Sequence, residues 1–462
     1  MKKFLAVLAS AALAAVMLFC GCTPADGRDG RDGKDGQDIS VTQLYEAAKS
    51  LPGNENLTLE DFLREYLSYN DDALRQELSF KTAVNKSLMC GVSILTRFAY
   101  SSKAGGALGV LPSARTYQVY TGSGVIIWLD KPAGDAYVVT NCHVVYDDTS
   151  ITPYCDDIRL YLYGQDTSGV NYVVDSSANI SGDENYRIKA DIAGVSKNYD
   201  LALLKVSGSE VLKRSDAMSA EFADNIDAYA GETVYAIGNA SGEGMSATDG
   251  IISKDSEYIS LTLSEKDNPL DSDYISYRVM RTTAPINHGN SGGAMYNTKG
   301  EIIGIVNAKD EGEDIDNMGY VLPVNNVRRI IGLMRDNFEA NGYTGPGVKK
   351  AYMNIQTQVT DSYSRYNAQT GLAEIYETIR VVDVLGEPAL GKLYKDDIIR
   401  EVKITSGNTV KDSIKVTRNY QISEILFSAR RGDTVVIKVE RGGTELEVSI
   451  PLDSDKCFNL IA

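Results

Sequence analysis

Short apolar runs separated by turn residues dominate the chain beyond Ala83. Examples are the runs at residues 91–95, 124–128 and 233–238. Many short strands broken by Gly, Asp and Ser indicate closed antiparallel β structure rather than alternating strand–helix–strand units. This pattern predicts a mainly β body that occupies most of the chain.

A different periodicity precedes this body, over residues 39–80. Ser40 and Thr58 each stand directly before a stretch with helical spacing, and both are residue types preferred at helix N-caps. The second stretch places Leu59 and Phe62 on one face. The sequence therefore predicts a short helical segment over residues 39–80, packed as a small subdomain.

The N-terminus has the pattern of a signal sequence. Two lysines precede an apolar run over residues 4–19 that is slightly short for a membrane span. The run leads into the sequence LFCGC at residues 18–22, which resembles a bacterial lipobox with cleavage after Gly21. We expect residues 1–21 to be a lipoprotein signal peptide and Cys22 to carry the lipid. This predicts an extracytoplasmic protein, anchored by its lipid on the outer face of a bacterial cell membrane; an uncleaved signal anchor would leave the body on the same side.

Glycine recurs at every third position between this anchor and the helical segment. Such a repeat is the collagen pattern, but four triplets without proline are too few for a stable triple helix. We therefore interpret residues 22–38 as a hydrophilic Gly-X-Y spacer. Nucleation of a trimer stays open as the alternative.

The segment at residues 289–293, Gly-Asn-Ser-Gly-Gly, has the properties of a serine nucleophile inside its own oxyanion hole. A serine hydroxyl needs a base to take its proton, and the tetrahedral intermediate needs N–H donors. The glycines let the chain turn tightly enough for the N–H groups of Gly289 and Ser291 to point the same way. We therefore predict an oxyanion hole formed by Gly289, Asn290 and Ser291.

A base and an acid for Ser291 are expected from two other segments. The chain has only two histidines, and His288 is too close in sequence to be an obvious base. His143 follows an apolar strand that ends in a polar turn, and Asp200 stands at the start of another apolar run. The order His143, Asp200, Ser291 is one of the orders in which a Ser-His-Asp triad is built. These three residues are the predicted catalytic residues.

Two further motifs, at residues 121–125 and 300–305, flank the three candidate segments. Together the five segments resemble the HtrA/DegP family of serine proteases. The resemblance covers residues 83–333 and implies a chymotrypsin-like protease domain over residues 82–340, built from two six-stranded β-barrels with the triad between them. It also implies an endopeptidase that acts on unfolded or misfolded proteins and peptides in envelope quality control, with possible assembly as a homotrimer. A peptide-binding chaperone with an inactive protease centre is the alternative.

Primary specificity is predicted from the position six residues before the serine. Proteases of this architecture that cut after Lys or Arg carry an acid there, whereas this chain has Pro285. Ile305, Val306 and Asn307 lie on the strand that resembles the wall of the pocket. We therefore expect these four residues to form a substrate pocket for small or aliphatic side chains.

The C-terminal third resembles a PDZ domain, first of all in the run at residues 379–384, although Asp396 stands where that family has glycine. The resemblance covers residues 351–455 and implies an α+β fold that binds extended peptides by strand addition. Gly371 and Leu372 are the nearest candidates for its carboxylate-binding loop. A domain docked for assembly, with little peptide binding, is the alternative.

Composition limits the remaining possibilities. The net charge of −17 argues against a nucleic-acid partner, which would need a basic face. No cofactor or metal is expected, because two histidines and scattered cysteines form no cluster with the usual ligand spacing. An extracytoplasmic location permits disulfides, but buried free thiols are equally compatible with the four cysteines beyond the lipobox, which are Cys90, Cys142, Cys155 and Cys457.

Overall fold

The computed structural model describes residues 41–59, 61–62, 72–102, 114–165, 186–224, 228–262, 274–309, 318–345 and 347–461. The chain divides into two compact units, Met1–Leu78 and Ser79–Ala462, and we describe each by itself. The expected signal peptide, Cys22 and the Gly-X-Y spacer lie outside the described residues. No helix in these described ranges is both long and apolar enough to cross a membrane.

The first unit contains helix α2 (Val41–Lys49) and the start of the second predicted helical stretch. Thr58 caps this stretch as expected, because its hydroxyl accepts a hydrogen bond of 3.1 Å from the N–H of Asp61. Phe62 and Ala48 are both buried in a small apolar cluster. The helical prediction for this region is therefore supported where the structure describes it.

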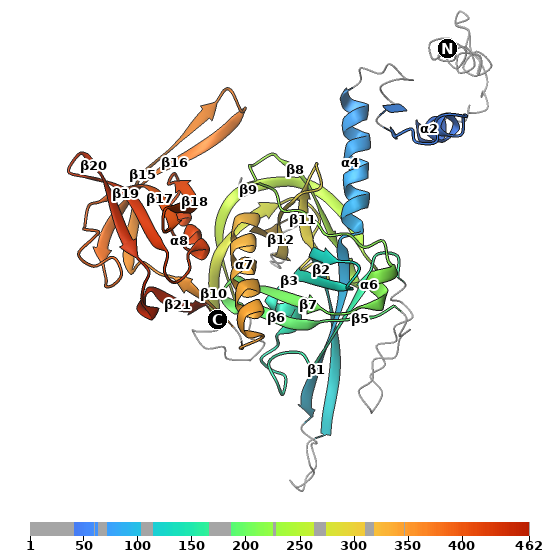
Figure 1. Ribbon diagram of the computed structural model, residues 1–462, viewed down its shortest axis with the longest axis horizontal. Helices are drawn as coiled ribbons and strands as arrows, with labels where there is room; N and C mark the ends of the chain where they lie inside the picture. The colour runs from blue at the N-terminus through green and yellow to red at the C-terminus, as the bar shows by residue number, and fades with distance from the viewer. Residues whose placement is uncertain are drawn as a thin grey trace, which may run out of the picture. The chain divides into compact units, whose positions relative to one another are not determined.

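Helix α4 (Asp72–Leu88) continues past residue 80, where we expected the helical segment to end. A seven-stranded antiparallel sheet follows, in the order β5-β4-β1-β2-β3-β7-β6 (Figure 1). Because β3 and β7 are antiparallel neighbours in this sheet, the segment that follows β3 lies beside the segment that precedes β7. The strands are β1 (Gly91–Ser102), β2 (Ala114–Asp130), β3 (Asp135–Thr140), β4 (Asp157–Leu162), β5 (Ile188–Lys189), β6 (Asp191–Ser196) and β7 (Leu201–Val206).

Six further strands form a closed barrel, in the order β10-β13-β12-β11-β8-β9 (Figure 1). The first sheet also closes, as the resemblance implied, because β5 and β6 at the two ends of its order are consecutive and separated only by Ala190, whose N–H donates to the Ile158 carbonyl of β4 over 3.2 Å. One apolar cluster takes residues from both sheets, among them Val139 and Ile237, so the two sheets pack together. The barrel strands are β8 (Thr233–Gly238), β9 (Ser246–Thr262), β10 (Tyr274–Thr282), β11 (Ala294–Asn297), β12 (Ile302–Lys309) and β13 (Gly319–Pro323).

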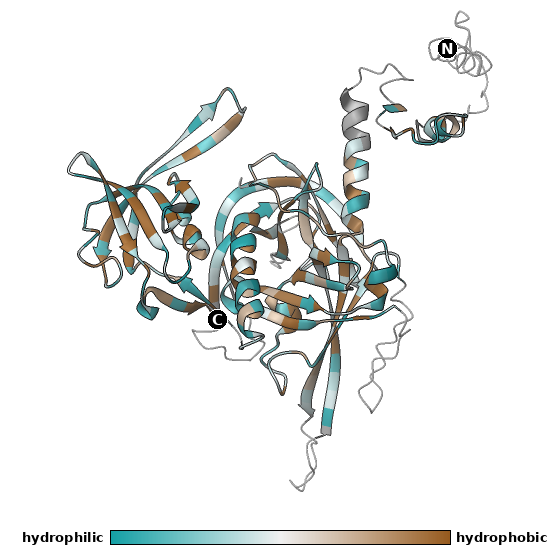
Figure 2. Cartoon of the chain, viewed as in Figure 1, coloured by the Kyte–Doolittle hydropathy of each residue, from teal (hydrophilic) through white to brown (hydrophobic). Residues whose placement is uncertain are grey.

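Helix α7 (Val324–Asn341) leads to a C-terminal domain of mixed α and β structure, as the α+β prediction required. Its main sheet has the order β15-β16-β17-β19-β20, with β18 on β17, and helix α8 (Tyr420–Ile425) packs in the same core. The β15–β16 hairpin alternates hydrophilic and hydrophobic residues (Figure 2). The strands are β14 (Val348–Ala351), β15 (Ile355–Asn367), β16 (Leu372–Val384), β17 (Ile398–Ser406), β18 (Thr409–Lys415), β19 (Thr434–Arg441), β20 (Thr444–Pro451) and β21 (Phe458–Ile461).

Buried contacts join the barrel to the C-terminal domain. Arg278 on β10 binds Glu424 on α8 through two hydrogen bonds of 2.5 and 2.9 Å, and both side chains are buried. The rings of Tyr199 and Phe427 meet edge to face with centroids 5.0 Å apart. The C-terminal domain therefore touches the residue that immediately precedes Asp200.

Candidate active site

His143 and Asp200 meet at the ends of two paired strands. Thr140 of β3 lies opposite Ala202 of β7, so the short helix α5 (Cys142–Val145) starts beside Asp200. The Nδ1 atom of His143 lies 2.7 Å from Oδ2 of Asp200, and the main-chain N–H of His143 donates to Oδ1 over 2.9 Å. Both carboxylate oxygens of Asp200 therefore contact His143, one through its main chain and one through its ring.

The main chain at Asp200 has an uncommon conformation. Its φ of 46° and ψ of 49° are left-handed, which Asp tolerates better than most residues because of its short polar side chain. The Asn141 amide donates to the Asp200 carbonyl over 2.8 Å. The Asp200 side chain is only 1% exposed, so its charge depends on hydrogen-bond donors for stabilisation.

Asn307 connects this pair to Ser291. Its amide donates to Oδ2 of Asp200 over 2.6 Å, and its main-chain carbonyl accepts the hydroxyl of Ser291 over 2.9 Å. The hydroxyl of Tyr277 in turn donates to the Asn307 side-chain oxygen over 2.7 Å. Asp200 thus contacts His143 directly and is linked to Ser291 through Asn307, and the serine hydroxyl is directed at Asn307.

The buried hydroxyl of Tyr277 completes this chain of donors. Burial and the nearby charge of Asp200 raise the pKa of Tyr277 well above its usual value, so the hydroxyl remains protonated and able to donate. The contribution of Tyr277 was not predicted, and the sequence signal for it is weak, because one tyrosine within a strand is ordinarily a core residue.

The surroundings of His143 favour its protonated form. Burial disfavours the charged imidazole, but the charge of Asp200 and the hydrogen bond to it outweigh burial and raise the pKa of His143. Since 37% of the side chain remains exposed, solvent reduces the effect of burial, which strengthens this direction. Once neutral, the ring is oriented to accept a proton at Nε2, because Nδ1 faces the carboxylate.

The first predicted oxyanion donor is the N–H of Gly289. The preceding carbonyl, of His288, accepts a hydrogen bond of 2.7 Å from the N–H of Ser241. In a planar trans peptide the C=O and N–H point in opposite directions, so the Gly289 N–H is directed away from Ser241. Gly289 itself has a φ of +94°, and a Cβ there would lie 2.2 Å from the Asn239 carbonyl oxygen. Only glycine fits this position.

The second predicted donor is the N–H of Ser291. The carbonyl of Asn290 accepts a hydrogen bond of 3.0 Å from the N–H of Gly293, so the Ser291 N–H of the same peptide points the other way. The Asn290 N–H instead donates to the Asn287 carbonyl over 3.0 Å. Asn290 therefore shapes the loop through its main chain, and the N–H groups of Gly289 and Ser291 stay the predicted donors.

Residues 122–305 match the family model of the trypsin-like peptidase domain. This part of the chain is a trypsin-like serine peptidase domain. The chain is 28% identical over 338 residues to "Serine protease Do-like HtrA" of Bacillus subtilis (strain 168), covering 72% of this chain and 63% of that protein. It is 27% identical to the protein of the same name from Lactococcus lactis subsp. lactis (strain IL1403), covering 77% of this chain and 79% of the relative. We therefore describe the peptidase as HtrA-like.

Among solved structures, the chain is similar to an HtrA-type protease AlgW with a decapeptide. The sequence identity is 19%, the TM-score is 0.46, and the match covers 82% of this chain and 98% of the other.

The predicted substrate pocket of the peptidase domain needs correction. Ile305 and Val306 are fully buried, and they pack in two different core clusters because successive side chains of a strand point to opposite faces of the sheet. The register of β12 against β13 shifts between Val306 and Ala308, so Asn307 occupies a bulge and its side chain reaches Asp200. Of these strand residues, only Asn307 belongs to the site.

Pro285 and the proposed peptide-binding loop lie in different surroundings. Pro285 is exposed, and its carbonyl accepts the Thr248 hydroxyl over 3.0 Å. Gly371 and Leu372 lie at the turn of the β15–β16 hairpin, where the Gly371 N–H closes the turn onto the Asn367 carbonyl. The role of each in substrate binding stays a prediction.

All four cysteines described by the structure are free thiols. Cys142 adjoins His143 but is fully buried, and burial raises the pKa of Cys142 well above the usual value. A thiol in that state is a poor nucleophile. Of the two alternatives for these four cysteines, the structure has free thiols and no disulfide among them.

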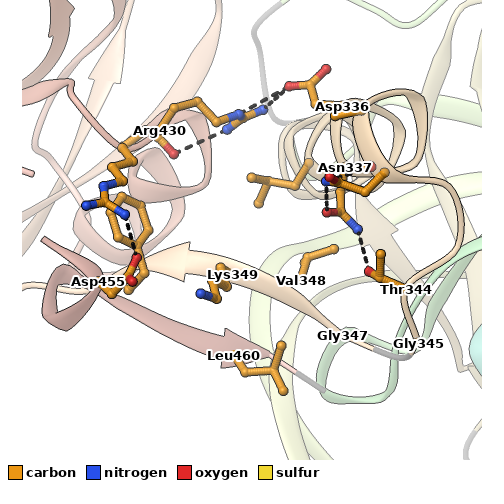
Figure 3. A pocket seen from close by; sticks show the side chains of 16 residues that line it. Asp336, Asn337, Thr344, Gly345, Gly347, Val348, Lys349, Arg430, Asp455 and Leu460 are labelled. Carbon is orange, nitrogen blue, oxygen red and sulfur yellow. Dashed lines mark hydrogen bonds and ion pairs between the residues drawn. The ribbon is translucent and has the colours of Figure 1, made fainter. Parts of the chain in front are cut away.

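A cavity of about 530 Å³ lies between α7, β14 and the C-terminal domain (Figure 3). Arg430 and Asp336 form an ion pair of 2.7 Å at its edge, and Arg431 pairs with Asp455 over 3.1 Å. None of the predicted catalytic or oxyanion residues lines it, so this cavity is separate from the candidate active site.

Proposed function

We propose that this protein is an exported, membrane-tethered serine endopeptidase that hydrolyses peptide bonds in unfolded or misfolded envelope proteins. The observation that carries the proposal is the buried carboxylate of Asp200, bound to His143 at 2.7 Å and linked through Asn307 to Ser291. This arrangement supplies a base, an acid that orients it and a hydroxyl linked to that acid through one residue.

The proposed reaction begins when Ser291 leaves the Asn307 carbonyl and turns toward Nε2 of His143. The hydroxyl attacks the scissile carbonyl while His143 accepts its proton, and Asp200 stabilises the imidazolium that forms. The N–H groups of Gly289 and Ser291 bind the oxyanion. His143 then gives the proton to the leaving amine, and water repeats the sequence to release the acyl group.

A peptide-binding chaperone with an idle peptidase centre is the second candidate. It is favoured by one observation, the hydrogen bond of 2.9 Å that directs the Ser291 hydroxyl to the Asn307 carbonyl. If this arrangement persisted with substrate bound, the serine would have no base. The two candidates differ in whether Ser291 becomes reactive.

A fluorophosphonate probe followed by mass spectrometry separates these candidates, because it labels an activated serine. We expect labelling of Ser291 in the full chain and digestion of unfolded casein, both abolished in Ser291→Ala and His143→Ala. Equal casein digestion by the wild type and Ser291→Ala would end the peptidase proposal. Absence of labelling together with binding of unfolded casein would favour the chaperone.

The location and assembly are further parts of the proposal. The lipobox-like sequence supports attachment of lipid to Cys22, and the PDZ-like C-terminal domain and homotrimeric assembly follow from the family resemblance. In cells fed a radiolabelled fatty acid, the wild type should be labelled and sediment with membranes. Cys22→Ser should lose the label; an equally labelled variant would overturn the anchor.

A further inference from the structure

Ser123, in the motif at residues 121–125, is a fully buried serine on β2 whose polar groups contact the predicted nucleophile loop, the end of β3 and Asn239. Its hydroxyl donates to the Gly289 carbonyl over 2.5 Å and accepts the Asn239 N–H over 2.7 Å. Its main-chain N–H donates to the Ser291 carbonyl over 2.9 Å. Its carbonyl accepts the hydroxyl of Thr140 over 2.7 Å.

These contacts connect separate parts of the peptidase domain. Thr140 ends the strand that leads to His143, whereas Gly289 and Ser291 belong to the nucleophile loop of the barrel. Ser123 therefore lies between the segment of the base and the segment of the nucleophile. It is the point at which the first sheet fixes a loop of the barrel.

The approach is so close that a side chain on the loop would not fit. A Cβ at Gly292 would lie 2.2 Å from both the Ser123 carbonyl oxygen and the Thr140 hydroxyl. Contacts under 3.0 Å require the neighbours to move, and here one of them is main chain. The loop is thus held against Ser123 by its main chain alone.

The hydroxyl of Ser123 controls a peptide group on which both oxyanion donors depend. The peptide between Gly289 and Asn290 has its carbonyl held by Ser123 and its N–H held by the Asn287 carbonyl. Glycine offers little resistance to rotation, so without these bonds the peptide could turn and carry the neighbouring N–H groups with it. Two bonds on opposite sides of one planar unit prevent that rotation.

We propose that Ser123 is a positioning residue of the oxyanion hole: through its hydroxyl it holds the Gly289 carbonyl and so aims the N–H groups of Gly289 and Ser291. This inference rests on the proposed peptidase function. It assigns Ser123 an effect on the transition state and none on the basicity of His143, whose contacts to Asp200 it does not touch.

The test is Ser123→Ala in the full chain, with Ser93→Ala as the matched control. Ser93 is the buried serine directly opposite Ser123 in the pairing of β1 with β2. Loss of one oxyanion donor costs about 10²–10³-fold in turnover, and a misaimed donor is a partial loss. We expect kcat of Ser123→Ala on a peptide substrate to fall about 10–100-fold, with KM changed less than about threefold.

Two further readouts separate positioning from a general structural role. A peptide boronic acid, which forms a tetrahedral adduct with the serine, should bind Ser123→Ala more weakly by about the factor lost in kcat. The acid limb of the pH profile of kcat/KM should keep its position, and Ser93→Ala should match the wild type in both. Unchanged kcat and boronate affinity in a folded Ser123→Ala would overturn the inference, as would a shifted acid limb.

If Ser123→Ala does not fold, Ser123→Cys provides the second variant, because its thiol is a weaker donor in the same place. It should show an intermediate loss of kcat, and a kcat equal to that of the wild type would overturn the inference. Failure of the peptidase proposal is distinguishable, since the wild type itself would then resist the fluorophosphonate probe.

Discussion

Two buried carboxylates in the second unit, Asp200 and Glu424, are held in opposite ways. Asp200 is 1% exposed and is bound by an imidazole, a main-chain N–H and the amide of Asn307. Glu424 is 9% exposed at the junction with the C-terminal domain and is bound by Nε and Nη2 of Arg278 and by the amide of Asn326. Each carboxylate thus contacts a cationic or potentially cationic side chain and a side-chain amide.

The difference lies in whether that partner can change its charge. Arginine stays protonated in proteins and binds a carboxylate with two parallel hydrogen bonds, so the pair at Glu424 has a fixed geometry and a fixed charge. An imidazole gains and loses its proton near neutral pH. We infer that the pair at Glu424 serves to hold two domains together, whereas the pair at Asp200 serves to move a proton.

Asp200→Asn tests this comparison with the largest expected effect. The amide keeps the size of the side chain but removes the charge that stabilises the imidazolium and fixes its tautomer. The corresponding change in the chymotrypsin-type triad lowers kcat by about 10⁴-fold, and we expect a similar loss here. Steady-state hydrolysis of a peptide substrate measures it, with calorimetry to establish that the variant is folded. Activity within about tenfold of the wild type would mean that Asp200 is not the orienting acid.

Glu424→Gln should act on stability rather than on chemistry. Breaking a buried ion pair by removing one partner typically costs about 3–5 kcal/mol, because the other charge stays buried without compensation. We expect a lower melting temperature, or an earlier separate transition of the C-terminal domain, measured by differential scanning calorimetry.

The double variant Arg278→Met with Glu424→Leu serves as the control for Glu424→Gln. It removes both charges while retaining apolar volume, so it should recover most of the lost stability. If Glu424→Gln melts like the wild type, the junction does not depend on this pair.

Asn307→Ala is expected to have an intermediate effect. Hydrogen bonds to charged groups contribute about 1.5–3 kcal/mol, so loss of the Asn307 donor to Asp200 should lower kcat about 10–100-fold. Tyr277→Phe should lower it less, because Tyr277 only orients the Asn307 amide. The matched control is Asn326→Ala, which removes an amide from Glu424 instead and should leave kcat close to the wild-type value. Equal kcat losses in Asn307→Ala and Asn326→Ala would remove the distinction between the two carboxylates.

The residues that bear the chemistry were predictable because each needs a local sequence of its own. The nucleophile loop requires glycine where φ is positive or where main chains touch, and Gly289 and Gly292 satisfy both conditions. Asp396 is a weaker example of a position whose main-chain conformation favours glycine. It stands where the related family has glycine, and its φ of 75° is left-handed.

The residues that support the site and the domain junction were not predictable. Their positions depend on the pairing register of the strands and on how the barrel packs against the C-terminal domain. Asn307 was assigned to a substrate pocket, but a bulge in β12 turns it toward Asp200, and a single sequence gives no sign of such a bulge. Arg278 and Glu424 are 146 residues apart and meet only when two domains pack.

The smallest expected effect is the pH dependence of the two ion pairs: the His143–Asp200 pair should change with pH near neutrality, whereas the Arg278–Glu424 pair should not. Because the pKa of His143 is raised, its imidazole stays protonated to a higher pH than usual, and only the neutral ring accepts the serine proton. We therefore expect kcat/KM to rise with pH along an acid limb above about pH 6.5, the ordinary value for histidine. The raised pKa also means that the His143–Asp200 pair stabilises the fold below the unfolded pKa and loses this contribution as pH rises through the folded one. The Arg278–Glu424 pair should contribute equally over this range, since arginine does not titrate there.

The titration of His143 is measured by NMR. The chain has only two histidines, so ring resonances in Ser291→Ala can be assigned by comparison with a Ser291→Ala, His288→Gln variant. A His143 ring that titrates below about pH 6.5 would show that burial outweighs the carboxylate. The electrostatic distinction between Asp200, beside a titrating partner, and Glu424, beside a permanently charged one, would then be lost.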